Sequence, residues 1–204
     1  MTGEVLRDEQ NARERLLESA MELFAEKGYE GVSVREIVQG AKVTKPVLYY
    51  YFGNKEGLYQ TLVEEALETY RGVLEIAMSK KRTVLEQLVE MVSLQLDFCQ
   101  KNQRLVRFIY SVLFNPPVSA PPYDFDRFYQ ANLTALKEIV NRGVEKGELE
   151  KRSIEEVAFL LLGLVNIHAM NQIFSQGTKI PEEVVQKGVE IVYQGIRRTR
   201  GRDR

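Results

Sequence analysis

The sequence has few of the residues that build most catalytic and metal sites. Its one cysteine, Cys99, excludes an internal disulfide and a zinc site made of several cysteines, and it suits a reducing cytoplasm. Its one histidine, His168, has no serine or cysteine partner in a nucleophile motif. Spaced histidine and glutamate ligands and a glycine-rich phosphate loop are also lacking. We therefore expect a protein that is not an enzyme and that uses no metal or cofactor.

The chain also lacks a long apolar run and an excess of charge of one sign. The longest apolar run, residues 157–165, is too short to span a bilayer, and the polar start, residues 1–11, has no apolar segment typical of a secretory signal. We expect a cytoplasmic protein with no membrane partner. The 204 residues include 28 basic and 29 acidic side chains, for a net charge of −1. A protein that coats nucleic acid without sequence preference is usually strongly basic, so any positive surface here is local.

Proline is rare and concentrated in one segment, and the remaining sequence shows helical periodicity. Four of the six prolines lie in residues 115–122, which therefore cannot be helical and form either a rigid connector or the rim of an entrance. Elsewhere apolar residues recur every three or four positions, without strand-like alternation. We predict an all-α fold of about nine helices, over residues 11–27, 34–40, 45–52, 54–78, 83–101, 104–114, 124–146, 153–176 and 181–198.

Two short helices joined by a tight turn are predicted near the N-terminus. Ser33 and Glu36 have the spacing of a capping box, and Val32 and Ile37 have that of a hydrophobic staple, so the first helix is expected over Val34–Gly40. A four-residue turn leads to the next helix. This is the helix-turn-helix pattern, in which the second helix enters the major groove of DNA.

The second helix carries an unusual set of side chains. Thr44 is expected at its N-cap, with the hydroxyl accepting a backbone N–H bond, and Pro46 fits the first turn. Leu48 and Phe52 share a face that can anchor the helix to a core, whereas the three consecutive tyrosines between them cannot all be buried. The 19-residue window that ends at Lys55 contains three lysines and no acidic residue. Exposed lysines and phenols in such a window suit a polyanion.

Four motifs follow one another over residues 10–60, namely Ser33–Ile37, Ala41–Lys45, Leu48–Phe52 and Asn54–Leu58. Together they resemble the DNA-binding signature of the TetR (tetracycline repressor type) family of transcriptional regulators. The resemblance covers about a quarter of the chain. Members often have glycine at the turn position that Lys42 occupies here, and this departure concerns only the local turn geometry.

The resemblance implies a role in DNA binding for nine residues. Arg35, on the first helix of the pair, matches a position that touches DNA. Base-facing positions are matched by Lys45, Pro46, Val47 and Tyr50, and phosphate-contacting positions by Thr44, Tyr49, Tyr51 and Lys55. The side-chain chemistry agrees, because lysines and phenol hydroxyls can hold phosphate and an apolar valine can meet a thymine methyl group.

The resemblance also implies two domains, a DNA-binding domain over residues 1–53 and a ligand-binding and dimerisation domain over residues 54–204. The helix over residues 54–78 would link the two mechanically. The helix opened by the capping box of Ser153 and Glu156 is apolar on two sides, so it needs two covers, and a second protomer can supply one. The resemblance then implies a homodimeric repressor, paired through its last two helices, that a small and mostly apolar effector releases from a palindromic operator.

The effector site is the least determined part of the sequence. The candidates are Phe98, Phe108, Tyr129, Asn166 and His168, and each is either a core or interface residue or part of a ligand cavity. The arginines near the C-terminus are either a solvated end or a phosphate contact. The rival function is a helical small-molecule-binding or adaptor protein without operator-specific DNA binding.

Overall fold

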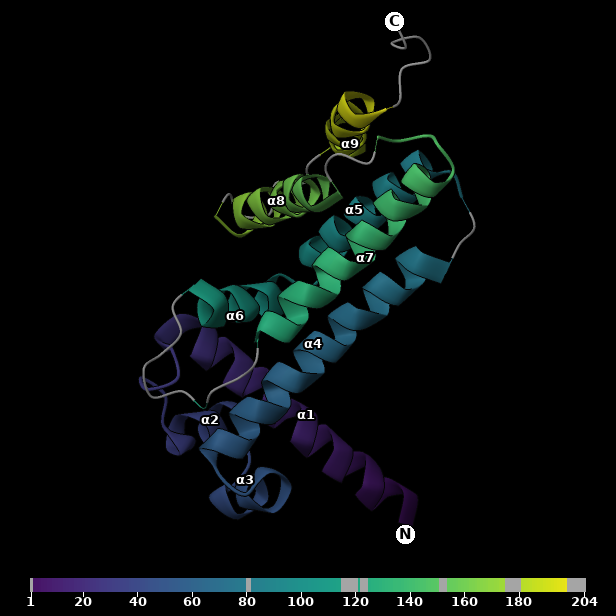
Figure 1. The fold of residues 1–204 in the computed structure, drawn as a ribbon. Helices are drawn as coiled ribbons and strands as arrows, with labels where there is room; N and C mark the ends of the chain where they lie inside the picture. The colour runs from purple at the N-terminus through teal and green to yellow at the C-terminus, as the bar shows by residue number, and fades with distance from the viewer. Residues whose placement is uncertain are drawn as a thin grey trace, which may run out of the picture. The chain divides into compact units, whose positions relative to one another are not determined.

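The computed structural model describes residues 2–79, 82–114, 121, 125–150, 154–174 and 181–197, and it describes side chains from residue 11 onward within most of these ranges. Nine helices make up this part of the chain (Figure 1). They are α1 Thr2–Lys27, α2 Val34–Gly40, α3 Lys45–Phe52, α4 Lys55–Ser79, α5 Val84–Lys101, α6 Gln103–Phe114, α7 Phe125–Glu145, α8 Ile154–Phe174 and α9 Glu182–Ile196. The predicted all-α fold is confirmed.

The helices group into two compact units. The head unit comprises Met1–Glu68 and Arg104–Tyr123, and the body unit comprises Thr69–Gln103 and Asp124–Arg204. The head unit therefore contains α1, α2, α3, the first part of α4 and most of α6. This grouping reflects packing, whereas the boundary predicted at residue 53 concerns function and stays a prediction.

The head unit is built on α1, which packs against α2 and α3. Its apolar stripe is buried, with Leu16 and Ala20 fully enclosed and Phe24 only 1% exposed. The Ser19 hydroxyl donates to the Ile37 carbonyl of α2 at 3.0 Å. These contacts hold α1 and α2 together, and the short helix α3 packs against both of them.

The body unit is built on α5, which packs against α7, α8 and α9. A capping box of Thr83 and Glu86 opens α5, with the Glu86 N–H donating to the Thr83 hydroxyl at 3.3 Å. The buried amide of Gln87 donates to the Ala77 carbonyl at 3.3 Å and accepts from Arg142 at 2.8 Å. The polar groups at this end of α5 are thus satisfied within the unit.

Helix α8 buries one side and exposes the other. Leu161 and Ala169 are fully buried, whereas Leu160 is 61% exposed and Ile167 is 60% exposed. By length and composition alone Ile154–Asn171 could cross a membrane, a test that core helices of water-soluble proteins also pass. The expectation from the shorter run over residues 157–165 therefore understated the apolar length of this helix. Its packing on α5, α7 and α9 accounts for the buried side only.

One sequence expectation about a helix end differs from the structure, and three other expectations lie outside the described residues. The first helix begins at Thr2, not near Asn11. The added turns are mostly polar, so apolar periodicity did not reveal them, although Glu4, Arg7 and Glu9 favour helix. The capping box at Ser153, residues 115–122 apart from Pro121, and the arginines after Arg197 lie outside the described residues.

Candidate nucleic-acid interface

Helix α2 is fixed at its start by the predicted capping box. The Glu36 N–H donates to the Ser33 hydroxyl at 3.2 Å, and the Ser33 N–H donates to the Glu36 carboxylate at 2.9 Å. Lys27, at the end of α1, forms an ion pair with the same carboxylate at 2.7 Å. The bond from Lys27, followed by those from Ser33, lowers the pKa of Glu36 to about 2. The box thereby ties α2 to α1.

The turn between α2 and α3 depends on a backbone conformation that favours glycine. Lys42 has a φ of +54°, in the left-handed region. The next residue, Val43, closes the turn with a bond from its N–H to the Val38 carbonyl at 3.0 Å. The chain therefore keeps the geometry for which relatives often use glycine, and it places a cationic side chain there.

Helix α3 begins where the sequence predicts, but one predicted bond is absent. Thr44 is the N-cap residue and Pro46 lies in the first turn, yet the Thr44 hydroxyl makes no cap hydrogen bond. A capping side chain accepts from the second or third helical N–H. Pro46 has no N–H, and the N–H of Val47 donates to the Thr44 carbonyl at 3.1 Å instead. The exposed hydroxyl is therefore not used in capping the helix.

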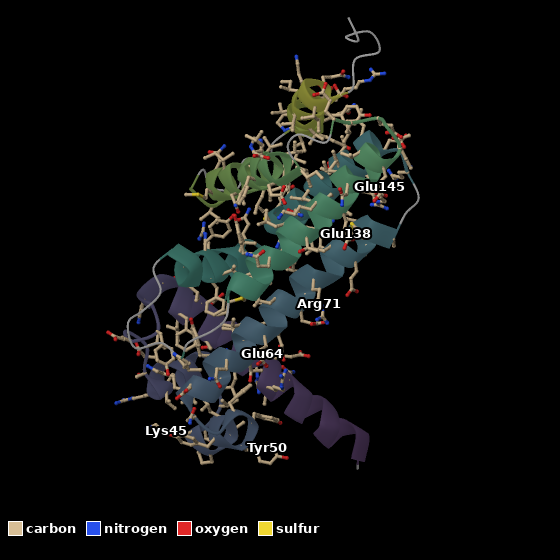
Figure 2. All side chains as sticks on the ribbon, in the orientation of Figure 1. Lys45, Tyr50, Glu64, Arg71, Glu138 and Glu145 are labelled. Carbon is tan, nitrogen blue, oxygen red and sulfur yellow. The ribbon has the colours of Figure 1, made fainter. Side chains whose placement is uncertain are left out.

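The two sides of α3 differ sharply in exposure. Leu48 is fully buried and Phe52 is 9% exposed, which confirms the predicted anchor to the core. Tyr50 is 78% exposed and Tyr49 is 48% exposed. Figure 2 shows Lys45 and Tyr50 on the outer side of this helix. The outer side offers phenols and a lysine, with no carboxylate from residue 37 to residue 55.

Eight of the nine predicted DNA-binding residues gather on α2, α3 and the residue before α3. Six of them are exposed, namely Arg35, Thr44, Lys45, Pro46, Tyr49 and Tyr50, while Val47 and Tyr51 are half-buried. Their arrangement forms a surface of one short helix with a flanking arginine. This size and chemistry match a recognition helix with phosphate contacts on its borders.

The ninth residue, Lys55, is engaged with its own chain. Its ammonium donates to the carbonyls of Tyr29 and Val32, each at 2.9 Å, and lies 4.1 Å from the centre of the Tyr29 ring. Burial lowers the pKa of this ammonium below its usual range. An ammonium has three N–H donors, so at most one remains for a phosphate. Lys55 thus clamps the loop between α1 and α2 to the start of α4, a role the sequence did not reveal.

The predicted effector residues do not all belong to one unit. Phe108 lies in the head unit, where it is 1% exposed, and the other four belong to the body unit. Phe98 packs edge-on against Tyr70 at 5.3 Å, and the Tyr70 hydroxyl donates to the side-chain oxygen of the buried Asn132 at 2.9 Å. His168 is half-buried, and burial lowers its pKa. Its imidazole is therefore neutral near pH 7.

Sequence reasoning missed a buried amide in the body unit. Gln95 is fully buried on α5, and both polar atoms of its side chain have no hydrogen-bond partner among the described residues. An unmet buried amide costs about 1–3 kcal/mol. Its position on the same helix as Phe98 could have been read from the sequence, but its burial without a partner could not.

Comparison with known proteins places these features in a family. Residues 16–62 match the model of the bacterial regulatory proteins of the tetR family. The HTH-type protein YttP of Bacillus subtilis is 39% identical over 102 residues, a match that spans 49% of each chain. The part of the chain that holds α2 and α3 is therefore of the TetR type, and the match covers their helix-turn-helix.

Two further proteins resemble this chain over most of its length. IcaR of Staphylococcus aureus, a negative transcriptional regulator of the biofilm operon icaADBC, is 23% identical over 152 residues, which cover 74% of this chain and 80% of IcaR. AibR, solved in complex with isovaleryl coenzyme A and operator DNA, aligns with a TM-score of 0.69 over 89% of this chain and 98% of its own, at 19% identity. The second likeness shows the fold.

Proposed function

We propose that this protein is a homodimeric repressor that binds a palindromic operator and leaves it when a small, mostly apolar effector binds. The observation that carries the proposal is the outer side of α3, where Tyr50 is 78% exposed while Leu48 beneath it is fully buried. A phenol this exposed contributes little to the stability of its own fold. The negative regulation by IcaR and the operator bound by AibR support this direction of control.

The residues of the interface divide into two roles. Lys45, Pro46, Val47 and Tyr50 face the bases, while Thr44, Tyr49 and Tyr51 hold the backbone. Arg35 on α2 touches the DNA beside them. The uncommitted hydroxyl of Thr44 at the start of α3 supports its phosphate role, because helix N-termini favour anions. Lys55 adds at most one phosphate contact, because two of its three donors already serve the clamp.

The exposed apolar sides of α8 and α9 support dimerisation through these two helices. Phe159, Leu160 and Ile167 are each more than half exposed on α8, and Val184 and Ile191 are 48% and 67% exposed on α9. A contiguous apolar surface on a water-soluble protein marks an interaction site. Two such helices from each protomer can pair as a bundle around a two-fold axis. A palindromic operator with half-sites about 34–36 Å apart, or a multiple of that, then fits two copies of α3.

The effector is proposed to bind within the body unit. The unmet amide of Gln95 and the aromatic pair of Phe98 and Tyr70 support this placement, because a ligand with a polar group could satisfy the amide while its apolar part packs on the rings. Tyr129, Asn166 and His168 remain candidate contacts. Domain roles follow, with DNA binding in residues 1–53 and effector binding and pairing in residues 54–204. The protein would act in the cytoplasm, where its DNA is.

Binding-site selection from random DNA tests the proposal. We expect a palindromic sequence bound by a dimer, with log K falling steeply as log salt rises because phosphates are held. The matched variants are Lys45→Ala, which should weaken binding, and Lys146→Ala, an exposed lysine after α7, which should not. Recovery of no preferred sequence would instead favour a small-molecule-binding or adaptor protein.

A further inference from the structure

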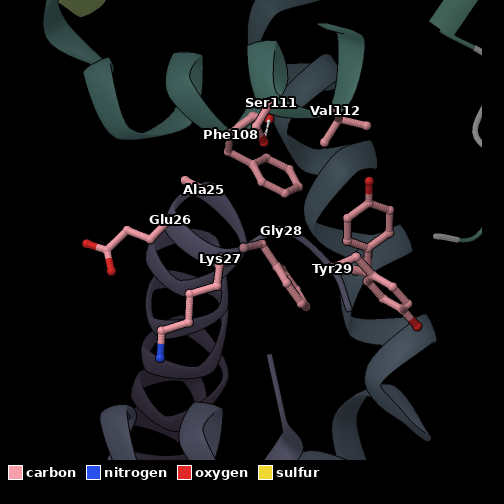
Figure 3. Close-up of a pocket in the computed structure, with 10 residues that line it drawn as sticks. Ala25, Glu26, Lys27, Gly28, Tyr29, Phe108, Ser111 and Val112 are labelled. Carbon is pink, nitrogen blue, oxygen red and sulfur yellow. Dashed lines mark hydrogen bonds between the residues drawn. The ribbon is translucent and has the colours of Figure 1, made fainter. Parts of the chain in front are cut away.

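The head unit contains a pocket of about 270 Å³ that the proposed function does not use (Figure 3). It is lined by the end of α1 and the following turn, by Tyr59 of α4, and by Phe108, Ser111 and Val112 of α6. A cavity of about 150 Å³ is enough to hold a benzene ring. The pocket is therefore large enough for a molecule of one or two rings.

Aromatic rings form the apolar wall of this pocket. Phe24 stacks on Tyr29 at 5.7 Å and meets Tyr59 edge-on at 5.4 Å, and Phe108 meets Tyr59 edge-on at 5.8 Å. All four rings line the pocket. Ring edges and faces at these spacings can extend the same offset or edge-on packing to a further ring.

One polar group of the pocket has no partner. Tyr59 is 2% exposed, and its hydroxyl has no hydrogen-bond partner among the described residues. Burial raises the pKa of this phenol to about 12, so the hydroxyl stays protonated and can both donate and accept a hydrogen bond. A ligand with a hydrogen-bonding group would satisfy it.

The other polar atoms of the pocket are mainly acceptors. The Ser111 hydroxyl donates to the Phe108 carbonyl at 2.7 Å, which leaves its lone pairs for a ligand. The last turn of α1 presents backbone carbonyls, whose dipoles disfavour an anion. The side chains of Glu26 and Lys27 point away from the rings (Figure 3). The lining thus suits a ligand with an N–H or O–H donor and no carboxylate.

We propose that this pocket is a second binding site, for a small aromatic molecule that carries an N–H or O–H donor. Tyr29 lies between this site and the start of α4. Its ring lines the pocket, while its carbonyl and ring face hold the ammonium of Lys55. Lys55 follows Gly53, the C-cap residue of α3, by two positions. An occupant that shifts Tyr29 changes the clamp beside α3 and so the affinity for DNA, a consequence that rests on the proposed function.

Indole is a suitable probe, because the chain has no tryptophan and the fluorescence of bound indole can be observed directly. Titration of the full-length protein with indole should give saturable binding, whereas benzoate should bind at least tenfold more weakly. Tyr59→Phe should weaken indole binding about three- to tenfold without loss of thermal stability, since the hydroxyl has no partner to lose. The matched control is Tyr193→Phe on α9, which should bind indole as the parent does.

A second variant makes the test independent of one hydroxyl. Ser111→Leu fills the pocket and should abolish indole binding, and circular dichroism would confirm that the helices remain. Absence of indole binding, or binding that neither variant alters, would overturn the site. The coupling to DNA is tested separately, by measuring operator affinity in saturating indole. If that affinity stays unchanged, the coupling through Tyr29 is overturned. A protein that binds indole at this pocket but selects no DNA would retain the site and refute the repressor.

Discussion

Helices α3 and α8 both expose large side chains, but the chemistry of those side chains differs. On α3 of the head unit the exposed groups are the phenols of Tyr49 and Tyr50, each of which ends in a hydroxyl that can bond a phosphate or a base edge. On α8 of the body unit they are the hydrocarbon chains of Leu160 and Ile167 and the ring of Phe159, which gain only by leaving water. Exposure alone does not distinguish the two surfaces, whereas the side-chain type indicates whether the partner that we propose for each is charged or apolar.

The largest expected effect comes from charging the apolar side of α8. Leu160→Glu combined with Ile167→Glu should convert the dimer to monomer, because two pairs of carboxylates would have to be buried. Operator affinity should then fall by at least about 100-fold, since one helix-turn-helix is too weak alone. Analytical ultracentrifugation and fluorescence anisotropy measure the two changes. Lys146→Glu is the control for the change in net charge. If the double variant stayed dimeric, α8 would not be part of the dimer interface.

A smaller effect is expected from the outer side of α3. Tyr50→Ala should reduce the ratio of operator binding to random-DNA binding by about 5- to 150-fold, in line with the loss of one good base contact of about 1–3 kcal/mol. Tyr49→Phe should weaken all sequences alike, because it loses a phosphate bond and no base contact. Competition binding with operator and scrambled DNA separates the two outcomes. If Tyr50→Ala weakened binding to both DNAs equally, Tyr50 would contact a phosphate and not a base.

Two lysines of the head unit differ in their surroundings. Lys55 bonds two carbonyls of its own chain, whereas Lys45 is exposed. Lys55→Met should lower the free energy of unfolding by about 2–3 kcal/mol, because two carbonyls lose charge-assisted bonds. Lys45→Met, at an exposed position, should leave stability within about 0.5 kcal/mol and weaken DNA binding instead. Urea unfolding and anisotropy distinguish them. If Lys55→Met keeps full stability and loses only DNA affinity, its phosphate role outweighs the clamp.

The smallest effect concerns the two capping boxes that the described residues show, one in each unit. Contacts with Lys27 and Ser33 lower the pKa of Glu36 from its ordinary value of 4.5 to about 2, so the folded state binds its proton more weakly than the unfolded state does. Its contribution to stability is present above about pH 4.5 and is lost as the pH falls toward 2. Glu36→Gln should flatten the dependence of the unfolding free energy on pH in that range, as urea unfolding at several pH values would measure.

Glu86 provides the matched control for this pH effect. Its pKa is also lowered, first by bonds from Thr83, but it lacks the lysine bond that Glu36 has. Glu86→Gln should therefore change the pH dependence of the unfolding free energy at acid pH less than Glu36→Gln does. An equal change for both variants would show that the capping serine and threonine, and not Lys27, account for the shift.

Local sequence rules predicted the head unit well because its features are local. The capping box at Ser33 and the anchor residues Leu48 and Phe52 involve residues three or four apart, and all are confirmed. The prediction of a capping bond to the Thr44 hydroxyl was wrong, because Pro46 removes one of the N–H groups that could donate it. The start of α1 was missed because its first turns are polar and give no periodic apolar signal.

Features that join distant parts of the chain could not be predicted in the same way. The Lys55 clamp reaches carbonyls 26 and 23 residues earlier, and no pattern of residue types specifies such a pairing. The pocket beside Tyr59 likewise depends on Phe108, which lies 49 positions later in the sequence. The DNA-binding residues were identified as a group by resemblance, and the structure adds their exposure, while their contacts with bases and phosphates stay predictions.

Helix α4 is uninterrupted over its 25 residues, and this length has a geometric consequence. At 1.5 Å per residue it extends about 37 Å, so a tilt of about 5° moves one end by about 3 Å relative to the other. That arc equals a full hydrogen-bond length, beyond which a phenol no longer reaches a base edge. The release from DNA that we propose would therefore need only a tilt of α4 by a few degrees, without unfolding of the helix.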